Sequence, residues 1–138
     1  MRSLRLHLLC LLMLICAADA LAQVPTIQRN FKGKPGSDIN VGIFASVHKN
    51  CTPAALPAIR VVSPPGHGKV TVKQGHLRAT NLPQCLAVDV PAFVAIYHSD
   101  KDYLGQDTFT LEVVNSGGKA QQQTVTVTLV APGSQKGI

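Results

Sequence analysis

The sequence predicts an all-β domain, a sandwich of seven or eight short strands. Apolar and polar residues alternate with a period of two in several segments, whereas no segment has the period of a helix. Clusters of glycine, proline and asparagine separate these segments at short intervals. The 138 residues are 46% hydrophobic and 14% charged. Such a chain is too apolar for a disordered protein and is long enough for one domain.

The two clearest predicted strands lie near the C-terminal end. In 107–114 Phe109, Leu111 and Val113 are expected to share one face, and in 124–130 valine and leucine alternate with threonine. The Asn-Ser-Gly-Gly sequence at 115–118 is typical of a tight turn. These two strands are therefore expected to form a hairpin.

Six earlier segments complete the predicted set of strands, which are 24–31, 39–47, 58–62, 69–73, 76–80 and 91–98. In the second of these, the apolar residues from Ile39 to Val47 are expected to share one face. The Pro-Pro-Gly-His-Gly sequence at 64–68 and Gln74-Gly75 are both predicted as turns. The segment 91–98 is apolar on both faces, as expected of a central strand.

The first 22 residues are typical of a secretory signal peptide. Two arginines and an apolar core at 8–15 precede an Ala-Leu-Ala sequence that favours cleavage between Ala22 and Gln23. The apolar core is too short to span a bilayer, so no transmembrane segment is expected after processing. The expected organisation is a signal peptide (1–22), one sandwich domain (23–130) and a flexible C-terminal tail (131–138).

The cysteines fit an exported protein. Cys10 and Cys16 would leave with the signal peptide, and Cys51 and Cys85 would remain. Two cysteines in an exported domain normally pair, so a Cys51–Cys85 disulfide is expected. A metal site built on the two thiolates would need further soft ligands at short spacing, and the sequence has none nearby.

Three segments together resemble bacterial immunoglobulin-like, cadherin-like domains. The sequence at 65–72 resembles their P-x-H-G-x-V-x-V segment, and the sequence at 103–109 resembles their Y-x-G-x-D-x-F segment. The alternating threonines and valines up to Leu129 resemble their closing strand. The motif positions are His67, Gly68, Tyr103, Gly105, Asp107 and Phe109. The resemblance covers roughly 59–130.

The resemblance implies an immunoglobulin-like antiparallel β-sandwich, exported to the periplasm or secreted by a bacterium. Members of the family generally serve as spacers, adhesion modules or carbohydrate- and protein-binding units and not as enzymes. This chain differs from the pattern in three respects. It holds one copy of the domain, it carries Cys85 in an inserted segment (81–90), and it has Leu111 where the family has tyrosine.

Each motif residue has an expected structural role. Gly105 allows a sharp turn, and Asp107 is expected to accept backbone hydrogen bonds from that turn. Tyr103 and Phe109 are expected to pack across the end of the sandwich, with the tyrosine hydroxyl on a backbone group. The glycines at 66 and 68 are expected to adopt positive φ in a hairpin.

Catalytic signatures such as G-x-S-x-G, H-E-x-x-H and C-x-x-C are absent from the sequence. The domain is therefore expected to be non-catalytic and to need no cofactor or metal. An alternative is a periplasmic metal- or ligand-binding protein, and a further one is a hydrolase or hydrolase inhibitor with an unrecognised site. Asp100, Asp102 and Asp107 could hold Ca²⁺. The histidines that could hold Zn²⁺ or Cu²⁺ are His48, His67, His76 and His98.

The formal net charge of +6 suits an anionic partner. Lys69, Lys73 and Arg78 are predicted to share one hairpin face and to be the candidate binding surface. The expected partner is an anionic glycan or a protein of the cell envelope. Nucleic acid is not expected, because the sequence has no dense basic stripe with stacking aromatic residues.

Overall fold

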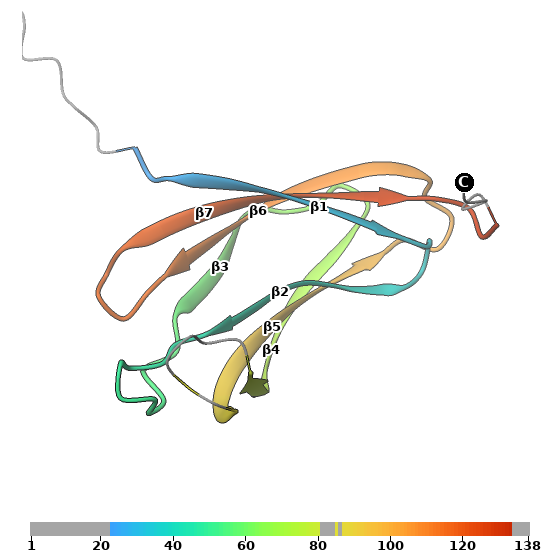
Figure 1. Ribbon diagram of the computed structural model, residues 1–138. Helices are drawn as coiled ribbons and strands as arrows, with labels where there is room; N and C mark the ends of the chain where they lie inside the picture. The colour runs from blue at the N-terminus through green and yellow to red at the C-terminus, as the bar shows by residue number, and fades with distance from the viewer. Residues whose placement is uncertain (1–22, 81–84, 86, 134–138) are drawn as a thin grey trace, which may run out of the picture.

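The computed structural model describes residues 23–80, 85 and 87–133, which form seven strands in two packed sheets (Figure 1). The strands are β1 (Thr26–Gly33), β2 (Asp38–Ala45), β3 (Ala58–Ser63), β4 (Gly68–Ala79), β5 (Val88–Ser99), β6 (Gly105–Val114) and β7 (Ala120–Leu129). The described residues contain no helix. None of them therefore forms a helix that could cross a membrane. The predicted all-β sandwich is confirmed.

The strand order is that of an immunoglobulin sandwich. One sheet has the order β1-β7-β6-β3 and the other the order β2-β5-β4. These orders correspond to the G-F-C and B-E-D arrangements of immunoglobulin domains, with β1 added beside the last strand. Every pair is antiparallel except β1 with β7, which is parallel. The described strands thus form an antiparallel sandwich with one parallel pair at its edge.

The core lies between the two sheets and is supplied mainly by β5, β6 and β7. Its fully buried residues are Val41, Ala95, Tyr97, Phe109, Leu111, Val125, Val127 and Leu129. In β7 the buried residues alternate with half-buried threonines, so the predicted period of two is confirmed. Burying a large apolar side chain stabilises a fold by about 1.5–3 kcal/mol. This alternation thus fixes which face of each sheet turns inward.

The predicted facing of β2 was wrong because the strand contains a bulge. Its register with β5 shifts between Asn40 and Gly42, so Val41 is an extra residue. A bulge reverses the alternation beyond it. Phe44 therefore packs against the core, while Ile43, expected inside, is 48% exposed.

The two predicted strands at 69–73 and 76–80 are a single strand, β4. Gln74 and Gly75 continue the ladder opposite Phe93 and Ala92 of β5, in unbroken register. The predicted Gln74-Gly75 turn was therefore wrong. Pairing with β5 keeps Gly75 in an extended conformation, because the residues on both sides of it stay paired with β5 in the same register.

The segment at 64–68 is not a hairpin turn within one sheet. It carries the chain from β3 in one sheet to β4 in the other. Gly66 and Gly68 do not have positive φ, so that expectation was wrong. Gly105, with φ +122°, and Gly118, with φ +78°, are the glycines of the β5–β6 and β6–β7 turns that do.

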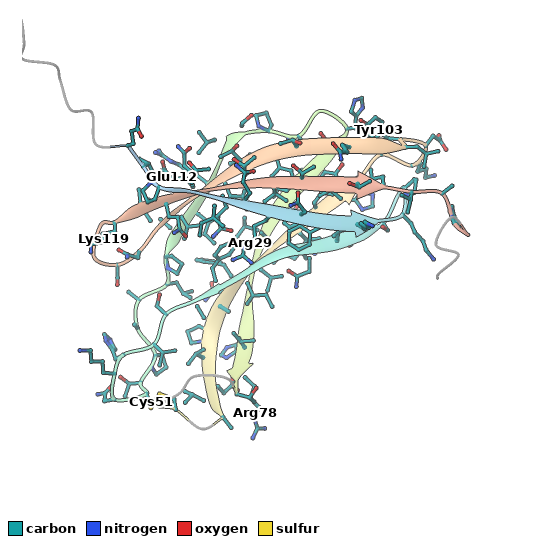
Figure 2. All side chains as sticks on the ribbon, turned by 45° about the horizontal axis from the view of Figure 1, so that its top comes forward. Arg29, Cys51, Arg78, Tyr103, Glu112 and Lys119 are labelled. Carbon is teal, nitrogen blue, oxygen red and sulfur yellow. A yellow bond between two sulfur atoms is a disulfide. The ribbon has the colours of Figure 1, made fainter. Side chains whose placement is uncertain are left out.

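The predicted disulfide is confirmed. Cys51 and Cys85 are bonded, with their Cα atoms 5.5 Å apart. The bond joins the β2–β3 connection to the β4–β5 connection at one end of the molecule (Figure 2). The predicted signal peptide (1–22), much of the inserted segment and the tail beyond residue 133 lie outside the described residues.

Candidate functional site

The two motifs meet at the carboxylate of Asp107, at the start of β6. Its Oδ1 accepts hydrogen bonds from the backbone N–H groups of Gly66 (2.9 Å) and Thr108 (3.0 Å). Its Oδ2 accepts from the backbone N–H of His67 (2.9 Å) and from the Tyr97 hydroxyl (2.8 Å). The bonds to Gly66 and His67 hold the β3–β4 crossover against β6, and the bond to Thr108 is local to β6.

Tyr97 completes this cluster from the other sheet. It is fully buried on β5, and its hydroxyl lies 3.0 Å from the carbonyl oxygen of His67 as well as against Asp107. Its ring stacks on Phe109, with centroids 5.5 Å apart. One side chain thus connects both sheets and the crossover between them.

The ring of Tyr103 packs on the outer side of the cluster around Asp107, where it covers His67. It stacks on His67 with centroids 3.7 Å apart and planes 8° from parallel. Its hydroxyl donates to the carbonyl oxygen of Gln106 at 2.7 Å, across the turn at Gly105. Phe109 stacks on Tyr97 and not on Tyr103, so the two aromatic residues of the second motif have different ring partners.

The shared hydrogen bonds shift both titratable groups in the cluster. Burial by itself would raise the pKa of the Asp107 carboxyl, but the hydrogen bonds from Tyr97, Gly66, His67 and Thr108 outweigh burial and lower that pKa. Burial first, and then the hydrogen bond to Asp107, raise the pKa of the Tyr97 phenol well above its ordinary value. The folded protein thus favours an ionised Asp107 beside a neutral Tyr97.

Gly68 is required by close packing. A Cβ atom at this position would lie 2.5 Å from the carbonyl oxygen of His98 and 2.7 Å from the Tyr97 ring. Backbone atoms cannot yield as a flexible side chain can. The glycine of the first motif therefore lets β4 approach β5 at the point where Tyr97 crosses beneath it.

The cluster around Asp107, formed with Gly66, His67, Tyr97 and Thr108, has a structural role, because its hydrogen-bonding groups are paired within the chain. Among the described residues, no buried side-chain nitrogen or oxygen lacks a hydrogen-bond partner. The carboxylate of Asp107 accepts four bonds from groups of this chain and is only 4% exposed. These residues fix the relative position of the sheets and of the loops at this end.

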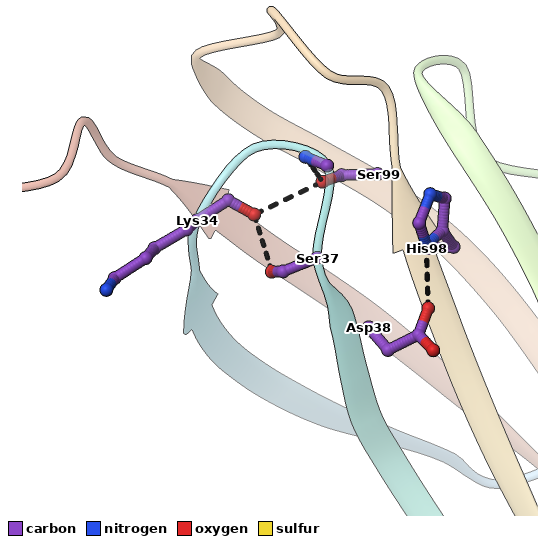
Figure 3. Close-up of polar contacts among 6 residues, drawn as sticks. Lys34, Ser37, Asp38, His98 and Ser99 are labelled. Carbon is purple, nitrogen blue, oxygen red and sulfur yellow. Dashed lines mark hydrogen bonds and ion pairs between the residues drawn. The ribbon is translucent and has the colours of Figure 1, made fainter.

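A second polar contact fixes the β1–β2 turn (Figure 3). The fully buried Ser99 accepts a hydrogen bond from the Gly36 N–H (2.9 Å) and donates to the carbonyl oxygen of Lys34 (3.3 Å). Beside it, Asp38 and His98 pair on the exposed surface at 2.6 Å. Ser99, the last residue of β5, thus holds the turn that carries the chain from β1 in one sheet to β2 in the other.

The candidate metal ligands are distributed over separate parts of the fold. Asp107 is engaged by hydrogen-bond donors, whereas Asp100 and Asp102 are exposed in the β5–β6 turn. His76 pairs with Asp89, with Nδ1 and Oδ1 3.4 Å apart, whereas His67 stacks on Tyr103. Within the part of the chain that the structure describes, no three His, Cys, Asp or Glu residues gather in a metal-binding group.

The three candidate basic residues do not share a face, contrary to expectation. Successive side chains of a strand point to opposite faces, and β4 runs from Gly68 to Ala79 without a bulge. Lys69 and Lys73 therefore lie on the outer face of their sheet, and Arg78 lies on the other. Figure 2 shows Arg78 at the end of β4, far from Lys119 in the β6–β7 turn.

Two depressions lie on the surface of the described residues. One depression of about 400 Å³ lies between the end of β1 and the segment after β7, lined by Lys32, Gly33, Lys34, Val130, Ala131, Pro132 and Gly133. Another, of about 270 Å³, lies beside the β6–β7 turn. The linings of these two depressions contain none of the motif residues.

Sequence reasoning did not identify Tyr97 or Ser99 as structural centres. The available signal was a polar atom in an otherwise apolar central strand, because a buried hydroxyl needs a partner. The identity of that partner depends on chain segments about 30 to 65 residues away.

Comparisons with protein-family models, with curated proteins and with solved structures give no match.

Proposed function

We propose that the protein is a small exported immunoglobulin-like domain that acts without catalysis, as a binding module in the cell envelope or outside the cell. The observation that carries the proposal is the cationic strand β4, which lies at the free edge of the three-stranded sheet. The Cys51–Cys85 disulfide supports an oxidising compartment, where such bonds persist.

We also infer kinship with bacterial immunoglobulin-like, cadherin-like domains. The strand order supports it. So does the contact between the two motif segments, because Asp107 of the second motif binds the backbone of Gly66 and His67 in the first. This contact gives a physical reason for the two motifs to occur in one domain.

The proposed partner is an anionic component of the envelope. Lys69 and Lys73 project from one face of β4 and Arg78 from the other, and all three residues are exposed. Exposed charges attract opposite charges over about 8–10 Å at physiological ionic strength. Such a strand would attract an anionic partner to the edge of the sheet from either side.

Co-sedimentation of the mature protein with isolated envelope fractions tests this function. We expect binding that weakens as salt rises, and that is lost in the double variant Lys69→Glu/Lys73→Glu. Lys119→Glu makes the same type of charge reversal in the other sheet's turn and should bind like the wild type. Equal sedimentation of all three proteins, or sedimentation of none, would contradict the proposal.

A further inference from the structure

β4 has the longest continuous free edge among the described strands. It spans twelve residues without proline, and its pairing with β5 continues without a register shift from Gly68–Ser99 to Ala79–Val88. Figure 1 shows β4 beside β5 alone, at the margin of its sheet. An edge of this kind can serve as a template for a further strand.

The other edge strands are shorter or interrupted. β2 has a bulge at Val41, and β3 has six residues and a register shift between Val61 and Ser63. β1 has eight residues. Bulges, short lengths, prolines and charged side chains, lysine above all, are the usual means by which proteins prevent an edge from pairing. β4 has no bulge and no proline and is long, so the charges of Lys69, Lys73 and Arg78 are its protection against unselective pairing.

The hydrogen bonds at the start of the β4–β5 ladder show which backbone groups point outward. The carbonyl oxygen of His67 accepts from Asp100 N–H at 3.0 Å, whereas Ser99 N–H points the other way, to Ser37. Opposed pairs in an antiparallel ladder alternate between hydrogen-bonded and non-hydrogen-bonded. The β4 residues whose N–H and C=O groups face the free edge are therefore Gly68, Val70, Val72, Gln74, His76 and Arg78.

The charge of β4 selects the kind of strand that can be added. The strand carries Lys69, Lys73 and Arg78 and has no acidic residue. Pairing with β4 of a second copy would place these cations beside the same cations of the other chain, and like charges on adjacent strands are destabilising. An acidic strand would instead place carboxylates beside them.

We propose that β4 binds an extended acidic segment of a partner protein as an additional strand of the β2-β5-β4 sheet. Main-chain hydrogen bonds to the outward groups of β4 supply the affinity, and the lysines supply the selectivity. Acidic side chains four residues apart on the partner strand would face Lys69 and Lys73. This inference rests on the proposed function and names its partner class.

Three synthetic peptides of about ten residues test the proposal. In the first, glutamate alternates with threonine; in the second, lysine replaces glutamate. The third keeps the glutamates but has N-methyl groups on every backbone nitrogen, which removes its hydrogen-bond donors on both edges. We expect binding of the first peptide only, with at least a tenfold loss of affinity for each of the others.

Amide hydrogen exchange on the wild-type protein identifies the mode of binding. The first peptide should slow exchange at Val70, Val72 and Gln74. The amides of Thr71 and Lys73 already face β5 and should change little. Gln74→Pro removes one outward N–H without removing a bond to β5 and should weaken the peptide at least fivefold, while Lys119→Glu should not.

The outcomes separate this inference from the proposed function. Equal binding of the N-methylated peptide, or no protection of the outward amides, would overturn strand addition. If envelope binding still depended on Lys69 and Lys73, the proposed function would stand without it. A complete lack of binding to the acidic peptide would also overturn the inference, and a lack of envelope binding as well would overturn both.

Discussion

Replacing Asp107 by alanine removes the acceptor that joins the crossover to β6. Four donors lose this acceptor. One of them, the Tyr97 hydroxyl, retains a second acceptor, the carbonyl oxygen of His67 at 3.0 Å. Leaving a buried donor unpaired costs about 1–3 kcal/mol. Gly66 and Thr108 are exposed residues, so water can hydrate part of what is lost. We expect Asp107→Ala to lower the free energy of unfolding by about 2–4 kcal/mol.

Urea unfolding followed by far-ultraviolet circular dichroism measures this change. Asp102→Ala is the matched control, because Asp102 is an exposed carboxylate in the neighbouring turn, and it should change stability by no more than about 0.5 kcal/mol. A loss below about 1 kcal/mol for Asp107→Ala would refute the role given to the carboxylate. So would equal losses in the two variants.

The stabilisation by Asp107 should also depend on pH. Its pKa is lowered in the folded protein, so the unfolded state binds the proton more readily. The contribution is therefore fully present above the ordinary carboxyl pKa, and it is lost as pH falls through the lower pKa of the folded state. The stability difference between wild type and Asp107→Asn should shrink over this acidic range and stay constant near neutral pH.

Three further changes test other parts of the fold. Cys85→Ala should cost about 2–4 kcal/mol in urea unfolding, and a reductant should cause a similar loss in the wild type only. Gly68→Ala should destabilise by more than about 2 kcal/mol, whereas Gly75→Ala, whose Cβ would have no neighbour within 4 Å, should stay within about 0.5 kcal/mol. Because the pKa of Tyr97 is raised, wild-type stability should fall once pH exceeds the ordinary phenol pKa, and Tyr97→Phe should reduce that fall.

The sequence was sufficient where local pattern and local structure agree. Alternating threonine and valine around the Asn-Ser-Gly-Gly turn predicted the β6–β7 hairpin, which forms with Val114 opposite Ala120. The disulfide followed from cysteine number and the predicted export. In these cases no distant segment alters what the neighbouring residues favour.

Local pattern was insufficient where a distant strand decides the conformation. The residues around Val41 do not predict a bulge. Pairing with β5 sets the register of β2, and this register decides which of Ile43 and Phe44 faces the core. Gly75 is a common turn residue, yet pairing with Ala92 keeps it in a strand. The expected partners of Asp107 were in its own turn, but Gly66 and His67 lie about 40 residues earlier.

Site-specific photo-cross-linking in living cells tests most directly whether β4 is the binding surface. A photoreactive amino acid at Thr71, which is exposed between Lys69 and Lys73, places the probe on β4 and keeps both lysines, and one at Lys119 places it in the β6–β7 turn of the other sheet. The account predicts a discrete adduct from position 71 that disappears with Lys69→Glu, joined to an acidic peptide of the partner, and no such adduct from position 119. Adducts from position 119 but not from position 71 would contradict it.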